Sequence, residues 1–233
     1  NISYGFLKLG VRKGDKIATI TLNRPEWNFL DMGILQTGAI HVPIYPTISE
    51  SDYNYILKHA EVKFVFVSGK ELLSKIKHIL PEVPSLKGVY SFKQIDEVKH
   101  LDELINLGKS NTQPELLKKI SQAIQPGDPA TLIYTSGTTG FSKGVMLPQR
   151  SLLGNIEFAR KYMFMNPGER ILSFLPLAHA FGCMVEFLFP FTLGCHITFL
   201  TKTPAPSTIT EAFGRVKPNL IPSVPLVIEK IYN

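Results

Sequence analysis

The eleven residues from Tyr134 to Gly144 read YTSGTTGFSKG and combine residue types that can bind phosphate. They hold three glycines, four serine or threonine hydroxyls before Phe141, and one lysine. Glycine lets backbone N–H groups turn toward one point, while the hydroxyls and the lysine add donors and positive charge. A Gly/Ser/Thr-rich surface turn has a similar composition. The density of donors beside Lys143 favours a loop that holds a polyanion.

This loop differs from the common G-x-x-x-x-G-K-[ST] nucleotide loop, because Ser142 and Gly144 occupy the positions of its second glycine and final hydroxyl. A strand-like run, Thr131–Tyr134, leads into the loop, and an apolar run closed by Pro148 leads out of it. Proline disfavours an immediate helix there. We therefore expect strand, loop, strand, with phosphate affinity from backbone amides, hydroxyls and Lys143 rather than from a helix terminus.

The sequence YTSGTTGFSKGVML resembles the phosphate-binding signature of the AMP-forming acyl-adenylate enzymes, which include acyl-CoA synthetases, luciferases and peptide-synthetase adenylation domains. A second segment, Phe174–Gly182, reads FLPLAHAFG and is similar to the L-P-x-x-H segment that lines the carboxylic-acid pocket of that family. One departure is Ser142, where most members have proline, which leaves the loop less rigid without removing a phosphate donor. The resemblance covers essentially all 233 residues.

Two further segments resemble the long-chain fatty acid branch of this family. They are NRPEWNFLDMGILQTGAIHVPIYPT, from Asn23 to Thr47, and KPNLIPSVPLVIEKIYN, from Lys217 to Asn233. The second departs from the V-P-R-x-W-E-K pattern of that branch at Leu226 and Ile228, so chain-length specificity stays open. The resemblance implies activation of a long-chain fatty acid to acyl-AMP and transfer to CoA, with ATP, Mg²⁺ and CoA as the small molecules used.

Adenylation makes AMP a leaving group, which a carboxylate needs because it is a poor electrophile. Negative charge builds on the departing pyrophosphate, and preorganised donors with a cation would stabilise it. We expect Lys143 to be the catalytic charge, and the resemblance implies that Thr138 also meets Mg²⁺. The expected nucleotide contacts are Thr135, Ser136, Gly137, Thr138, Thr139, Gly140, Lys143 and Gly144.

Among the six histidines, we assign a function to His179. A lone histidine beside apolar residues is usually a satisfied core side chain. The resemblance implies instead a catalytic, substrate-binding residue between the acyl pocket and the nucleotide, which orients the carboxylate. Phe181 and Gly182 are expected to line the acyl pocket, the glycine leaving room for a chain, although aromatic-rich apolar runs mostly build cores. Trp27, in a helix start, is expected to pack inward.

The composition bounds the remaining possibilities. Hydrophobic residues at 44% and charged residues at 19% indicate a folded globular chain. The net charge of +6 suits an anionic ligand or surface, but the lysines are dispersed, so we predict no nucleic-acid partner. Cys183 and Cys195 match neither a redox pair nor a zinc spacing and are expected to be buried thiols, and the histidines support no structural metal site. Fatty acid and CoA are the expected partners, and oligomeric state stays open.

The nineteen residues of Phe181–Phe199 are long enough to be considered as a membrane span. Glu186 near the middle would cost about 2.5 to 3.5 kcal/mol there. Pro190 and Gly194 should divide the run into a helix followed by a strand, so we expect buried core. We predict a cytoplasmic protein, and peripheral association with a membrane stays an open alternative. No signal peptide is visible, but the chain begins at Asn1 without methionine.

Alternating strand and helix patterns over the first hundred residues predict an α/β fold, a layered arrangement of two mostly parallel sheets flanked by helices. Residues 1–92 are expected to form a first βα lobe, 93–128 a polar helical connection, and 129–233 a lobe with the phosphate loop and acid pocket. Together these would be part of an N-terminal adenylate-forming domain, with the C-terminal domain absent.

Several family segments have no match before Asn233, namely the adenine and ribose motifs and the C-terminal lysine. We therefore expect this chain to be an incomplete N-terminal portion that is inactive by itself. Two alternatives to a CoA ligase stay open at this point. One is a fatty acyl-AMP ligase that loads a carrier protein, and the other is a non-catalytic module that binds nucleotide or fatty acid.

Overall fold

The computed structural model describes residues 1–135, 142–202, 204–225 and 228–229. The chain divides into two compact units. The first comprises Asn1–Thr21 and Glu26–Gln149, and the second comprises Leu22–Pro25 and Arg150–Asn233. Each unit has its own sheet.

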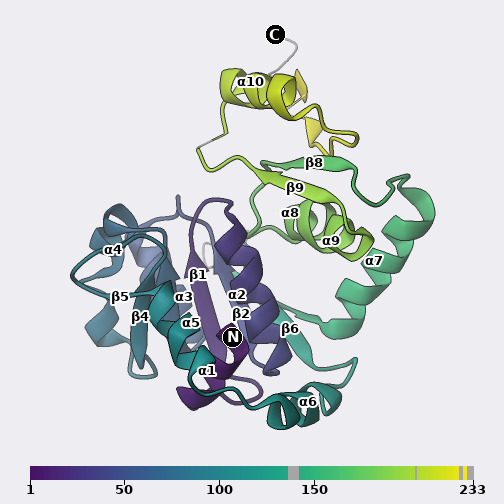
Figure 1. Ribbon diagram of the computed structural model, residues 1–233. Helices are drawn as coiled ribbons and strands as arrows, with labels where there is room; N and C mark the ends of the chain where they lie inside the picture. Colours follow the sequence, from purple (N-terminus) through teal and green to yellow (C-terminus); the bar gives the residue numbers. More distant parts are fainter. Residues whose placement is uncertain (136–141, 203, 226–227, 230–233) are drawn as a thin grey trace. The chain divides into compact units, whose positions relative to one another are not determined.

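The first unit is built on a seven-stranded sheet of order β5-β4-β3-β1-β2-β6-β7 (Figure 1). Neighbouring strands are parallel except for β6 and β7, which form an antiparallel pair at one edge. Parallel pairing brings the carboxyl ends of β1, β2, β3 and β6 to the same edge, where ligands of α/β sheets usually bind. The bounds are β1 (Lys16–Ile20), β2 (Ile40–Ile44), β3 (Val62–Val67), β4 (Gly88–Ser91), β5 (Lys99–His100), β6 (Pro129–Thr135) and β7 (Lys143–Pro148).

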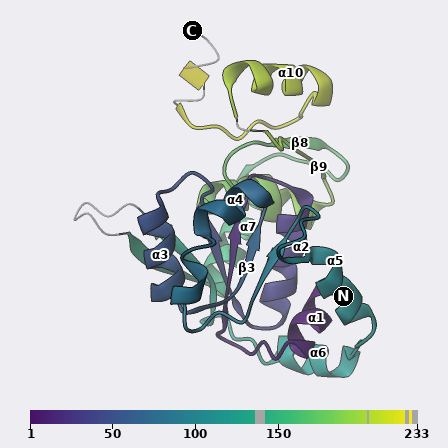
Figure 2. The ribbon, with the colours of Figure 1, turned by 90° about the vertical axis from the view of Figure 1, so that its left-hand side faces the viewer.

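Helices cover both faces of this sheet, α3 and α4 on one and α1, α2 and α5 on the other (Figures 1 and 2). Strand β3 shows why, because successive side chains leave a strand on opposite faces. Val65 and Val67 pack with α3 and α4, whereas Phe64 and Phe66 pack with α1, α2 and α5. The bounds are α1 (Ile2–Lys8), α2 (Pro25–Gln36), α3 (Glu50–His59), α4 (Lys70–Ile76), α5 (Leu101–Lys109) and α6 (Pro114–Gln122), with a 3₁₀ turn η1 (Leu80–Glu82).

A buried polar chain fixes α2 to the sheet. Nδ1 of His41 lies 2.7 Å from Oδ1 of Asp31 on α2, and its Nε2 lies 2.8 Å from Oγ1 of Thr19 on β1. Trp27 is 3% exposed and its ring centroid lies 4.8 Å from that of His41, which confirms that it packs inward. The side chains of Thr19, Asp31 and His41 are buried and satisfy one another through hydrogen bonds, so His41 acts as a core histidine.

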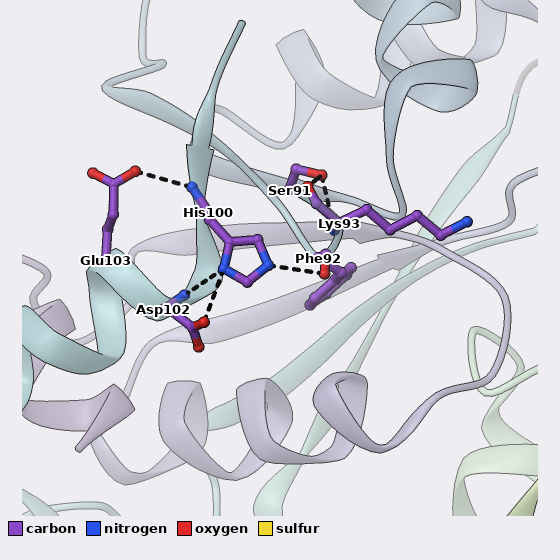
Figure 3. Close-up of polar contacts among 6 residues, drawn as sticks. All are labelled: Ser91, Phe92, Lys93, His100, Asp102 and Glu103. Carbon is purple, nitrogen blue, oxygen red and sulfur yellow. Dashed lines mark hydrogen bonds and ion pairs between the residues drawn. The ribbon is translucent and has the colours of Figure 1, made fainter. Parts of the chain in front are cut away.

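The polar connection after β4 is held by a histidine cap at the start of α5 (Figure 3). Nδ1 of His100 accepts a hydrogen bond from the backbone N–H of Asp102 at 3.2 Å, and its Nε2 donates to the carbonyl oxygen of Phe92 at 3.1 Å. The Glu103 carboxylate accepts from the N–H of His100 at 3.1 Å, which completes a capping box. These bonds fix where the helix begins.

The second unit has a parallel pair of strands, β8 and β9. A continuous helical stretch lies between them in sequence, and Gly194 ends it with a φ of 75°. The helix runs through Pro190, which lies in the first turn of α9, so of the two residues expected to break the run only Gly194 ends the helix. The bounds are α7 (Gln149–Tyr162), β8 (Arg170–Ser173), α8 (Ala180–Cys183), a π-helical turn η2 (Met184–Leu188), α9 (Phe189–Leu193), β9 (His196–Phe199) and α10 (Pro206–Val216).

The predicted α/β class with mostly parallel strands is confirmed. The segment Phe181–Phe199 forms helix and then strand, and across the described ranges we find no helix long and apolar enough to cross a membrane. Cys183 and Cys195 are half-buried rather than buried. Helix α2 ends at Gln36, two residues before Gly38, which adopts a φ of 71°. The three-part division at residues 92 and 128 stays a prediction.

Candidate functional site

Strands β6 and β7 precede and follow the glycine-rich loop, which is the expected order of strand, loop and strand, and they pair as an antiparallel hairpin. Thr135 ends β6 and pairs with Lys143, the first residue of β7. Directly opposite residues in an antiparallel pair share a face of the sheet. The threonine hydroxyl and the lysine ammonium group therefore leave the base of the hairpin on the same side, and both residues are exposed.

The incoming strand is fixed by Tyr134, one residue before Thr135. Its hydroxyl lies 2.7 Å from Nδ1 of His59 on α3, and Tyr55 contacts its ring edge-on with centroids 6.3 Å apart. Burial, with a smaller contribution from Tyr55, raises the pKa of Tyr134 to about 12, so the phenol keeps its proton and can donate to His59. A helix side chain thereby holds the strand at the point where the loop begins.

Gly144 pairs with Tyr134 across the hairpin. A side chain at this position would have its Cβ 3.0 Å from Cδ1 of Leu132 and 3.4 Å from the Tyr134 ring, so glycine makes space for these two residues. Its assignment as a nucleotide contact stays a prediction. The other predicted loop contacts lie outside the described residues: Ser136, Gly137, Thr138, Thr139 and Gly140.

His179 lies in the second unit, where it caps the N-terminus of α8. Its Nδ1 accepts a hydrogen bond from the backbone N–H of Phe181 at 3.1 Å. A neutral imidazole that accepts at Nδ1 carries its proton on Nε2. The residue is exposed, so the cap leaves an N–H donor that could meet a carboxylate.

Phe181 and Gly182 follow on the same helix. Phe181 is 42% exposed, so it presents apolar surface at the start of the same helix. Gly182 is buried, and a Cβ there would overlap the carbonyl oxygen of Pro176 and lie 3.2 Å from that of Leu175. Close packing of two backbone segments thus explains the glycine without a ligand, and a role for it in an acyl pocket stays a prediction.

Sequence reasoning missed the side chains that support the His179 segment. Asn23 makes three hydrogen bonds to residues 173–177, and Glu186 accepts hydrogen bonds from two backbone N–H groups of the same stretch. Glu186 is a carboxylate in a nearly uncharged run of the sequence. This pattern indicates that burying the group is costly, but it does not identify the hydrogen-bond partners. Nothing in the local pattern indicates that Asn23 would contact residues 150 positions away.

Burial raises the pKa of Glu186 to about 8, against the opposing effect of hydrogen bonds from Leu175, Ser173 and Phe174. An unfolded glutamate releases its proton near pH 4.3, so between that pH and about 8 the folded state holds a proton that the unfolded state has lost. The free energy of unfolding should therefore fall as pH rises through this window, by up to about 1.4 kcal/mol per pH unit from this group.

Replacing the group should remove that slope. We expect the Glu186→Gln variant to lose less stability between pH 5 and pH 8 than the wild-type protein, because glutamine has no proton to release. Urea unfolding of both proteins at several pH values measures the difference, and every other titrating group cancels in the comparison. Equal slopes would show that Glu186 titrates as it does in the unfolded chain.

Across the described part of the chain, no group of three or more His, Cys, Asp or Glu side chains is arranged to hold a metal ion. The first unit has its candidate groups, Thr135 and Lys143, at the base of the β6–β7 hairpin, and the second unit has His179 at the start of α8. The hairpin offers a cation and a hydroxyl suited to phosphate, and the helix offers a neutral N–H donor suited to a carboxylate.

Comparisons with known proteins show the family of the chain. A family model described as AMP-binding enzyme matches residues 1–233. The long-chain-fatty-acid–CoA ligase FadD15 of Mycobacterium bovis is 36% identical over 98% of this chain. The long-chain-fatty-acid–CoA ligase ACSBG1 of Rattus norvegicus is 31% identical over 99% of it.

The solved structures that resemble the chain give its fold. The anthranilate CoA ligase AuaEII, crystallised with anthranoyl-AMP, superposes with a TM-score of 0.85 at 23% identity and is matched over 97% of this chain and 43% of its own. The chain spans 38% of the length of FadD15 and 33% of that of ACSBG1. With the family model matched from Asn1 to Asn233, the chain belongs to the AMP-binding enzyme family.

Proposed function

We propose that the full-length protein carrying this chain is an ATP-dependent long-chain fatty acid–CoA ligase that works through an acyl-AMP intermediate. The observation that carries the proposal is the β6–β7 hairpin, which brackets the YTSGTTGFSKG signature and sets Lys143 opposite Thr135 at its base. The acid class is supported by the two relatives named as long-chain-fatty-acid–CoA ligases.

In the first half-reaction, a carboxylate oxygen of the acid attacks the α-phosphorus of ATP, and the bond from that phosphorus to the bridging oxygen breaks. Pyrophosphate leaves with the bonding electrons. The Lys143 ammonium group and the donors of the loop, Thr135 among them, would stabilise the charge that collects on it. The hydroxyl of Thr138 is an oxygen ligand of the kind Mg²⁺ prefers, and the ion, when bound, would neutralise part of the same charge.

His179 would orient the acid. Its Nε2–H, left available by the bond from Phe181 to Nδ1, would donate to the carboxylate, while the exposed Phe181 ring and Gly182 would lie along the acyl chain. In the second half-reaction the CoA thiol loses its proton and attacks the acyl carbon. The bond from that carbon to the AMP oxygen breaks, which yields thioester and AMP. The expected cytoplasmic location and peripheral membrane association belong to this proposal.

The experiment is a pyrophosphate-release assay on the purified full-length protein with ATP, Mg²⁺, CoA and fatty acids of different length. We expect release that depends on a long-chain acid, with one CoA thiol consumed per pyrophosphate, and no release with benzoate as the control acid. Release without thiol consumption would point to a carrier-protein acceptor. Nucleotide binding without release would contradict the proposal and favour a non-catalytic module.

A further inference from the structure

The stretch that joins β8 to α8 has little regular secondary structure, although much of it is buried. Phe174, Leu175 and Leu177 are 3%, 6% and 2% exposed. Buried backbone N–H and C=O groups outside helices and sheets need partners from side chains or water. Here two buried side chains, Glu186 and Asn23, supply partners for backbone groups of Phe174, Leu175 and Leu177.

Glu186 approaches the stretch from η2, and it is completely buried. Its Oε2 accepts hydrogen bonds from the N–H groups of Phe174 and Leu175, each at 2.9 Å. Because one oxygen serves both donors, the bonds persist when the other oxygen carries a proton. The π-helical turn is a widened helix geometry often found at functional sites, and it carries this residue.

Asn23 contacts the same stretch and lies in the short segment Leu22–Pro25, which belongs to the second unit. Its Nδ2 donates to the carbonyl oxygen of Leu175 at 2.7 Å, and its Oδ1 accepts from the N–H of Leu177 at 3.1 Å. The side chain is 7% exposed. Asn23 therefore fixes the backbone at Leu177, two residues before His179, and at Leu175.

Ser173 forms hydrogen bonds with both Asn23 and Glu186. Its Oγ accepts from Nδ2 of Asn23 at 3.0 Å and its hydroxyl bonds to the Glu186 carboxyl group. Ser173 is completely buried, so a bond lost here is not replaced by bulk water. The three side chains form one connected network around the backbone of residues 173–177.

We propose that Asn23 and Glu186 are positioning residues, which fix the backbone before His179 so that its imidazole meets the acid carboxylate. The inference rests on the proposed function, because it gives those residues a part in acid binding. The role proposed for Asn23 and Glu186 differs from that of the hairpin, which would bind ATP. Loss of the network should thus weaken use of the acid and leave use of ATP nearly unchanged.

The test measures acid-dependent ATP–pyrophosphate exchange by the full-length protein, at a temperature below the unfolding transition of each variant. We expect Asn23→Ala and Glu186→Leu to raise the KM for the fatty acid at least tenfold, with the KM for ATP within twofold of wild type. Glu186→Gln should stay within threefold of wild type, because its carbonyl oxygen can accept both N–H bonds. Ser173→Ala is a smaller change and should raise the KM for the fatty acid about threefold to fivefold. It tests the positioning role if Asn23→Ala or Glu186→Leu fails to fold.

Thr19→Val is the matched control, because it breaks a buried hydrogen bond to His41 in the first unit without touching this network. It should lower the unfolding temperature and leave both KM values unchanged. The positioning role would be overturned if every network variant kept the wild-type KM for the fatty acid. It would also be overturned if the KM for the acid and the KM for ATP rose equally in the network variants and in Thr19→Val. A wild-type protein without acid-dependent exchange would instead contradict the proposed function, and with it the acid-binding role.

Discussion

Replacing Lys143 with alanine should reduce kcat/KM for acyl-AMP formation by about 10² to 10³, the loss typical when a preorganised charge or donor is removed from a developing anion. Lys143 is exposed at the base of the hairpin, opposite Thr135, so the substitution removes the cation without opening a cavity. We expect the unfolding temperature to stay near that of wild type. Single-turnover formation of acyl-AMP by the full-length protein measures the effect directly.

Lys87→Ala is the matched control, because Lys87 is also exposed and precedes β4, far from β7 in the order of strands. It should keep wild-type activity, which separates a local effect from a general loss of positive charge. If Lys143→Ala retained wild-type kcat/KM at saturating and subsaturating ATP, the lysine would have no part in stabilising the departing pyrophosphate. The proposed chemistry of the hairpin would then be wrong.

Gly182→Ala should have the second largest effect, because the new methyl group would overlap the carbonyl oxygen of Pro176. Backbone atoms cannot rotate away as a side chain can, so α8 or the stretch before it must shift. Overpacking of this kind costs about 1 to 3 kcal/mol of stability. Because the stretch leads directly to His179, we expect a KM for the fatty acid raised at least tenfold along with a lower unfolding temperature.

Gly154→Ala provides the comparison in the same unit. Gly154 lies within α7, and nothing would contact its added Cβ within 4 Å. Alanine is the better helix former by about 1 kcal/mol, so this variant should unfold at an equal or higher temperature and keep the wild-type KM. Measuring thermal unfolding and acid KM for both variants tests the prediction. A Gly182→Ala protein as stable and active as Gly154→Ala would contradict the close packing at Pro176.

Local sequence patterns predicted much of the first unit. The alternation of strand and helix patterns over the first hundred residues was enough to predict a mostly parallel sheet. Pro148 correctly indicated a second strand after the loop rather than a helix. These features depend on residues near one another in the chain, which is why a single sequence carries them.

The supports of the candidate site could not be predicted in the same way, because they join distant residues. His59 reaches Tyr134 across 75 positions, and Asn23 reaches Ser173 across 150. A buried polar group must find a partner, but its sequence neighbours do not identify that partner. The continuation of the helix through Pro190 was also missed, since proline is tolerated in the first turn of α9.

The most direct test of the proposed chemistry follows the oxygen atoms of the acid. The full-length protein is supplied with ATP, CoA and a long-chain fatty acid labelled with ¹⁸O at both carboxylate oxygens, and the AMP product is analysed by mass spectrometry. Attack of the carboxylate on the α-phosphorus, followed by thiol attack on the acyl carbon, predicts AMP with one ¹⁸O atom. Unlabelled AMP, or ADP with phosphate in its place, would show that no acyl-AMP is formed.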